Sequence, residues 1–232
     1  MAASDLVLLQ GLRDTRGTLS EWSDRPWSVL RGWLGGSLVV SFGLLGAVLV
    51  VALLATPDET PFIVPGLQTD PELAAVGHVL FRNSLVLALH SMACVAGFIA
   101  GSSLPLEAER YSGVWRWVHD RAGPLAIGFV SAATLFSLTT QAYVLGNEAS
   151  TLSHQLGLSP AVLLLGLLPH ALPELTALFL PLAAWLIASR RKDWHVLLAA
   201  TFVTTAIAAP VLITASVVEV YVSPHLMAAL AR

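Results

Sequence analysis

Charged residues are scarce in this sequence of 232 residues. Only 12% are Asp, Glu, Lys or Arg, whereas 56% are hydrophobic. A soluble domain carries about twice that charged fraction. Several apolar runs reach about 18 residues or more, which is the length that a helix needs to cross a bilayer. Because only helices and closed barrels satisfy their backbone polar groups in lipid, these runs predict an all-α integral membrane protein.

Cysteines and catalytic motifs are equally sparse. The single Cys94 excludes an internal disulfide and a metal site built from several cysteines. The chain has no GxxxxGK[ST] phosphate loop, no HExxH zinc motif and no GxSxG elbow. No extended basic face supports nucleic-acid binding. We therefore predict no enzyme activity, no cofactor and no metal, and we expect any nucleotide hydrolysis to belong to a partner.

The apolar runs predict about five transmembrane helices behind a polar arm. Residues 1–33 carry leucines at near-helical spacing and several tryptophans. This pattern is typical of an amphipathic helix at a membrane surface, and an ordinary cytosolic helix is the alternative. We expect this arm as one region and 34–232 as a polytopic transmembrane domain. The expected spans are 35–54, 82–103, 124–145, 171–189 and 195–221.

Three prolines interrupt the apolar run 161–189, which is too long for one straight span. Proline removes a backbone donor and favours helix starts or kinks. We therefore expect a broken or re-entrant half-helix near 159–168 and a helix break at Pro169 and Pro173. The fourth span would follow this break.

Basic residues predict the orientation of the chain. All of the Lys and Arg except Arg82 and Arg232 fall before the first span, between the second and third, or between the fourth and fifth. The positive-inside rule then places the N-terminus in the cytoplasm and the C-terminus outside. We expect a multi-pass protein of the plasma membrane in contact with its lipid.

Polar residues from three expected spans reach a similar depth in this topology. Asn83 and His90 lie in the outer half of the second span and are seven residues apart, so they share a helix face. His170 and Glu174 lie at the outer start of the fourth span and are four apart. Glu219 lies at the outer end of the fifth. The sequence thus predicts one intramembrane polar cluster of Asn83, His170, Glu174 and Glu219, with His90 as an additional member.

Such a cluster has several chemical interpretations. Ionisable groups in a bilayer usually face the protein interior, pair with one another, or line a path for water or ions. The cluster can be a hydrogen-bonded knot that fixes helix packing, or a site for a proton, an ion or a substrate. A histidine with carboxylates also suits zinc, although this spacing matches no recognised zinc motif. A hydrolase centred on His170 and Glu174 would lack an obvious nucleophile.

The internal segment 109–120, ERYSGVWRWVHD, interleaves aromatic and charged residues. It predicts either an interfacial helix or a docking element for a cytoplasmic partner, similar to the coupling helices of transporter permeases. The candidate docking residues are Tyr111, Trp115, Arg116 and Trp117.

Four segments, in order, resemble the stage II sporulation protein M family of bacterial membrane proteins. They are FRNSLVLAL (81–89), GFIAG (97–101), PHALPEL (169–175) and VVEVYVSP (217–224), and the resemblance covers roughly residues 75–228. The resemblance implies that the family's site positions fall on Asn83, Pro169, His170, Glu174 and Glu219. Founding members of that family act in endospore engulfment with cell-wall hydrolases, and others occur near bacteriocin and transporter genes.

These observations leave two functional hypotheses. The first is a permease-like or transport-associated subunit that works as a homo-oligomer or with other membrane subunits, including a cytoplasmic ATPase partner. Its polar cluster would open outward, with the half-helix near 159–168 as a lid or re-entrant element. The second is a non-catalytic scaffold of a sporulation- or envelope-type complex, in which the cluster is structural. An accessible cavity at the cluster favours the first, and a dry, fully paired cluster favours the second.

Overall fold

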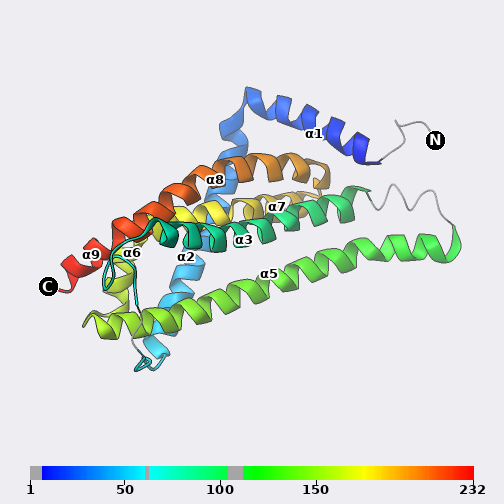
Figure 1. Cartoon of the computed structure of the whole chain (residues 1–232). Helices are drawn as coiled ribbons and strands as arrows, with labels where there is room; N and C mark the ends of the chain where they lie inside the picture. Colours follow the sequence, from blue (N-terminus) through cyan, green and yellow to red (C-terminus); the bar gives the residue numbers. More distant parts are fainter. Residues whose placement is uncertain (1–6, 61–62, 104–111) are drawn as a thin grey trace. The chain divides into compact units, whose positions relative to one another are not determined.

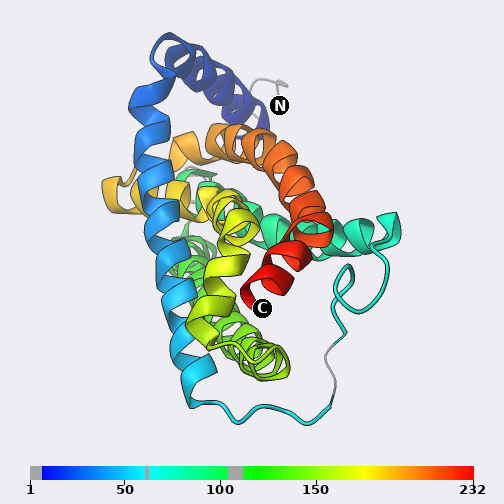
Figure 2. The ribbon, with the colours of Figure 1, turned by 90° about the vertical axis from the view of Figure 1, so that its left-hand side faces the viewer.

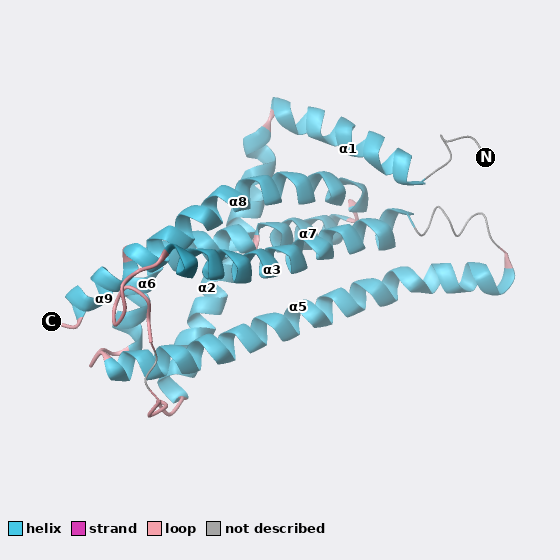
Figure 3. Cartoon of the chain, viewed as in Figure 1, coloured by secondary structure: helices cyan, strands magenta, loops and turns pink. Residues whose placement is uncertain are grey.

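The computed structural model describes residues 7–60, 63–103 and 112–232, and helices dominate these ranges (Figures 1 and 3). No strand occurs within them, apart from a single bridge between Pro65 and Thr69. In chain order the elements are α1 (Val7–Asp24), α2 (Pro26–Leu54), α3 (Leu73–Phe98), η2 (Ile99–Ser103), α5 (Gly113–Gln155), α6 (Pro160–Leu178), α7 (Leu180–Arg191), η3 (Trp194–Val196), α8 (Leu197–Tyr221) and α9 (Ser223–Leu230).

These helices are shared between two compact units. Unit 1 comprises Met1–Ser37, Leu87–Thr134 and Phe179–Ile207, and unit 2 comprises Leu38–Val86, Leu135–Leu178 and Ala208–Arg232. The chain passes from one unit to the other within α2, α3, α5 and α8, and between α6 and α7. Each passage falls inside one of the spans expected from the sequence. The boundary expected after residue 33 falls inside unit 1 and stays a prediction.

Five helices of the described chain are long and apolar enough to cross a membrane. They are Pro26–Leu54, Leu73–Gly101, Arg116–Gln155, Pro160–Leu178 and Trp194–Tyr221. Large apolar side chains on them face outward, such as Phe129 and Phe136 on α5, which are 75% and 73% exposed. Lipid covers such side chains in a bilayer at no cost, because its hydrocarbon is as apolar as the protein interior. The predicted all-α membrane fold is confirmed.

The expected helix break at Pro169 and Pro173 is wrong. Helix α6 runs unbroken from Pro160 to Leu178 with both prolines inside it, so no separate half-helix ends at 168. Each proline removes one backbone hydrogen bond, but the bonds on either side persist, and spanning helices tolerate this as a kink. The interruption comes instead at Phe179, where α7 begins with Pro181 in its first turn. The expected span 171–189 is therefore divided between α6 and α7.

Unit 1 is held by tryptophans that pack against small residues. Trp33 is buried with Leu180, Ala184 and Ala200, and the ring of Trp22 meets it edge-on at 5.1 Å between centroids. Through this contact α1 is tied to α2, and α1 also contacts η3 (Figure 1). The location of α1 at a membrane surface stays a prediction.

Unit 2 is held by close helix contacts and by an anchored loop. Helix α9 packs beside α6 (Figure 2), where a Cβ on Gly166 would come within 3.0 Å of Leu230 Cδ1. The loop after α2 is tied to the end of α5 by three hydrogen bonds. Ser150 Oγ donates to the Ala55 carbonyl at 3.1 Å, Asp58 N–H donates to Thr151 Oγ1 at 3.0 Å, and Gln155 Nε2 donates to the Thr60 carbonyl at 3.3 Å.

Candidate ligand-binding cavity

Unit 2 contains a cavity of about 580 Å³. This volume lies within the usual range of about 300–1,000 Å³ for sites that bind small molecules. Segments of α2, α3, α5, α6, α8 and α9 line the cavity, and Val64 of the loop before α3 also contributes. Leucine and valine side chains make up much of the wall, including Leu44, Leu45, Val48, Leu145, Leu164 and Leu167.

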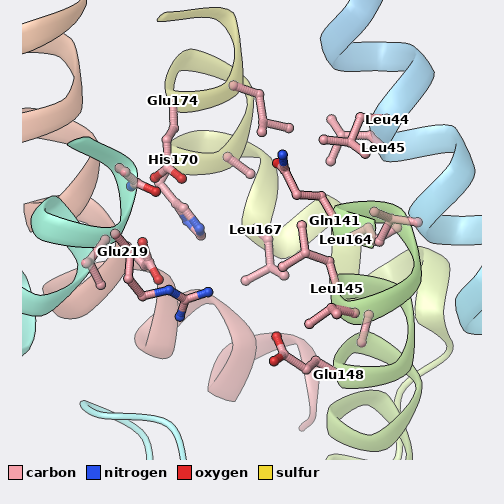
Figure 4. Close-up of a pocket in the computed structure, with 18 of the residues that line it drawn as sticks. Leu44, Leu45, Gln141, Leu145, Glu148, Leu164, Leu167, His170, Glu174 and Glu219 are labelled. Carbon is pink, nitrogen blue, oxygen red and sulfur yellow. The ribbon is translucent and has the colours of Figure 1, made fainter. Parts of the chain in front are cut away.

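The polar residues predicted to cluster meet at this cavity. Asn83 from α3, His170 and Glu174 from α6, and Glu219 from α8 all line it. His170 and Glu174 are one helical turn apart, so α6 presents both on one face. Figure 4 shows His170 pointing into the space between Glu219 and the leucines. Three helices therefore bring the four side chains together, as the depth argument required.

His170 is fixed by a contact with the last helix. Its side chain is only 7% exposed, and its Nδ1 lies 2.6 Å from Ser223 Oγ at the start of α9. A hydrogen bond between neutral groups that are both buried is worth about 1 kcal/mol and costs more to leave unmade. This bond orients the imidazole and joins α6 to α9.

The two intramembrane carboxylates lie close enough to repel each other. Glu219 acts electrostatically on Glu174, Arg82 acts on both carboxylates with the opposite sign, and the Asn83 side chain lies beside Glu174. Asn83 Nδ2 and Glu174 Oε2 are buried, and apart from their contact with each other they have no hydrogen-bond partner among the described residues. Because an unpaired buried polar atom costs about 1–3 kcal/mol, such atoms in a cavity commonly mark a place for water or a ligand.

Sequence reasoning missed several polar residues of the cavity, two of them on one face of α5. Gln141 and Glu148 of α5 line it from the side opposite Glu174 and Glu219 (Figure 4). They are seven residues apart and so share one helix face. The same spacing rule that linked Asn83 to His90 would have found them. Arg82, which the orientation argument set aside, also lines the cavity.

His90 does not line the cavity. It is fully buried in unit 1, where its ring meets Phe179 edge-on at 5.3 Å between centroids. Seven residues keep Asn83 and His90 on one helix face but separate them by about 10 Å along the axis. His90 is therefore not a member of the cluster that lines the cavity.

The candidate docking segment is described only in part. Tyr111 and the side chain of Trp115 lie outside the described residues. Trp117 is 56% exposed at the start of α5, and the Arg121 guanidinium lies 4.7 Å from the centre of its ring. Arg116 is also exposed. The role of this segment in binding a partner stays a prediction.

A search for metal sites in the described part of the chain found no group of three or more His, Cys, Asp or Glu side chains able to hold an ion.

Comparison with known proteins relates part of the chain to a family. Residues 122–224 match the family model for stage II sporulation protein M. This confirms the family resemblance and includes the segments that carry His170, Glu174 and Glu219. The segments 81–89 and 97–101, and with them Asn83, lie outside the matched residues. Searches of curated proteins and of solved structures gave no match.

Proposed function

We propose that this stage II sporulation protein M-like chain is a permease-like or transport-associated subunit of the plasma membrane, and that its cavity binds a small ligand. The observation that carries the proposal is the cavity of about 580 Å³ lined by the polar residues of three helices. A cluster that only fixed helix packing would be closed and fully paired. Here Asn83 and Glu174 both line the cavity, and beyond their contact with each other Asn83 Nδ2 and Glu174 Oε2 have no partner in the described chain.

The proposed topology sets the side from which the ligand enters. With the N-terminus in the cytoplasm, the loop after α2 and the C-terminus lie outside. Both belong to unit 2, which contains the cavity. We therefore place the ligand site on the external side of the membrane. Partner subunits, a second copy of the chain or a cytoplasmic ATPase would complete the machinery for transport.

A scaffold is the second candidate, and the length of α5 favours it. This helix has 43 residues, which corresponds to about 65 Å at 1.5 Å per residue, whereas the bilayer core is about 30 Å thick. One end therefore extends beyond the hydrocarbon and presents Trp117. Such an end offers a surface to a partner protein, which a scaffold requires.

Access to the cavity separates the two candidates. In a Cys94→Ala background, Leu167→Cys places a thiol on the cavity wall. Leu165→Cys, the matched control on the same helix, places it where the native side chain is 63% exposed and outside the cavity lining. A membrane-impermeant methanethiosulfonate reagent attacks the thiolate, which forms in water and not in hydrocarbon.

For a transport subunit we expect rapid modification of Leu167→Cys from the outside of intact cells and slow modification of Leu165→Cys. Equal protection of both thiols would show a dry cavity and would favour the scaffold. Modification only in inside-out vesicles would reverse the proposed topology.

A further inference from the structure

We propose that the cavity of unit 2 selects an amphipathic organic cation, that is, an ammonium or phosphonium centre carried on an apolar body. This inference deepens the proposed ligand-binding function and rests on it. Two features of the cavity carry the inference: an excess of carboxylates over cationic groups, and a lining that is otherwise largely hydrocarbon.

Carboxylates outnumber permanent cations in the wall. The lining contains three carboxylates, which are Glu148 of α5, Glu174 of α6 and Glu219 of α8. Among the described lining residues Arg82 of α3 is the only arginine or lysine. A carboxylate away from water is strongly unfavourable unless a cation or several donors compensate it. Arg82 acts on both Glu174 and Glu219 and can neutralise only one of them. With Glu148 as a third carboxylate the lining lacks two positive charges, and a bound monovalent cation would supply one of them.

The remaining lining argues for an organic cation over a hydrated metal ion. Ca²⁺ and Mg²⁺ take six or more oxygen ligands or retain water, and the walls beside the carboxylates are leucines and valines (Figure 4). Burying an apolar ligand surface against such walls favours binding, because it removes hydrocarbon from water. An organic cation matches both the charged side and the apolar side of the cavity.

The distribution of the polar residues also disfavours an anionic ligand. Figure 4 shows Glu174 and Glu219 on one side of the cavity and Glu148 on the other, so a negative group meets a carboxylate from either direction. Like charges placed together in an interface cost several kcal/mol and suppress the wrong partner. A fatty acid or a phosphate ester would therefore be rejected in spite of the apolar walls.

Two ions of equal shape and opposite charge test this inference. The full-length protein is reconstituted in lipid nanodiscs, and equilibrium binding of tritiated tetraphenylphosphonium and of tetraphenylborate is measured after subtraction of empty nanodiscs. We expect saturable binding of the phosphonium and none of the borate. Equal binding of the two ions, or no saturable binding of the phosphonium, would overturn the inference.

Charge variants assign the binding to the cavity. We expect Glu174→Gln and Glu219→Gln each to weaken phosphonium binding at least about tenfold, and Arg82→Gln to strengthen it. Glu72→Gln is the matched control, because it makes the same change of charge at an exposed residue outside the cavity lining. Glu174→Asp keeps the charge and should keep the binding, which separates loss of charge from misfolding. Phosphonium affinity that is unchanged in both glutamine variants would refute the assignment.

The same probe separates this inference from the proposed function. Bound phosphonium should protect Leu167→Cys from the thiol reagent, because both occupy the cavity. Binding and protection without any flux of the phosphonium in proteoliposomes would refute transport and leave the ligand class standing. Access of the reagent to the cavity without phosphonium binding would leave a hydrated site and refute the ligand class.

Discussion

Three glycines along α3 and its continuation in η2 experience different degrees of crowding. An added Cβ would meet nothing within 4 Å at Gly77, whereas at Gly97 it would lie 2.8 Å from Leu197 Cδ1 and 2.9 Å from Trp185 Nε1. At Gly101 it would overlap the indole ring of Trp194. Gly97 and Gly101, which form a GxxxG pair, therefore leave room for the side chains of Trp185 and Trp194 in unit 1. The three sites define a graded series of Gly→Ala substitutions.

Two opposing terms set the expected magnitudes. Alanine is favoured over glycine in a helix interior by about 0.5–1 kcal/mol, and overpacking costs about 1–3 kcal/mol. Gly77→Ala has only the first term and should stabilise the protein by about 0.5–1 kcal/mol. Gly101→Ala has both the gain in helix propensity and the cost of overpacking. Because Gly101 lies in the π-helical segment η2, the gain in helix propensity is smaller there, and we expect a net loss of about 1–2 kcal/mol. Gly97→Ala should fall between them, because the added Cβ would lie 2.8 Å from Leu197 Cδ1 and 2.9 Å from Trp185 Nε1, contacts that are longer than those at Gly101.

Reversible unfolding in mixed micelles, titrated with dodecyl sulfate, measures these differences in free energy. The double variant Gly101→Ala/Trp194→Leu is the control, since a smaller residue at 194 should remove the overlap and recover part of the loss. The reasoning fails if Gly101→Ala stabilises the protein as much as Gly77→Ala does. It also fails if removing the indole of Trp194 leaves the cost of Gly101→Ala unchanged.

Two further predictions concern unit 2. A double-mutant cycle of His170→Ala and Ser223→Ala should give a coupling free energy of about 0.5–1.5 kcal/mol, and additive single effects in the same unfolding assay would show that the 2.6 Å contact contributes nothing. The Thr60 N–H donates to Asp58 Oδ1 at 2.9 Å and holds the pKa of the Asp58 carboxyl below its ordinary value. A depressed folded-state pKa stabilises the protein above the unfolded pKa of about 3.9, and this contribution is lost as the pH falls through the folded value. The gap in thermal stability between the native protein and Asp58→Asn should therefore be largest near neutral pH and close on acidification, and a gap that widened in acid would contradict this assignment.

The number of spanning helices could be predicted from the lengths of the apolar runs. A bilayer sets a minimum of about 18–20 apolar residues for a spanning helix, and that rule located four of the five spanning helices of the described chain without any tertiary information. It placed the fourth at 171–189, whereas the structure has a spanning helix at Pro160–Leu178. It could not place the break in the fourth one. Pro169 and Pro173 were more conspicuous than Phe179, yet the chain is interrupted at Phe179. A proline deletes one hydrogen bond whose cost depends on the surrounding helix, so its position alone does not decide between a kink and a break.

The part of the site that could be predicted followed from the unfavourable free energy of placing polar groups in lipid. The predicted topology indicated the depth of each polar residue in the membrane, and the helical spacing indicated which residues share a helix face. Together they predicted the cluster of Asn83, His170, Glu174 and Glu219, all of which line one cavity. The same reasoning included His90, which lies about two helical turns away in unit 1. It omitted Glu148, because that residue was assigned to a loop although α5 continues to Gln155.

The sequence by itself determined that this protein is helical, that it crosses the membrane and which polar residues must find partners inside it, because the free energy of transferring a side chain into hydrocarbon depends on that side chain alone. Only the tertiary structure decided that Gln141 and Glu148 face the same cavity as Glu174, and that Ser223 holds His170. These outcomes depend on how α5, α6 and α9 rotate and pack, which is set by the summed contacts of many residues far apart in the chain.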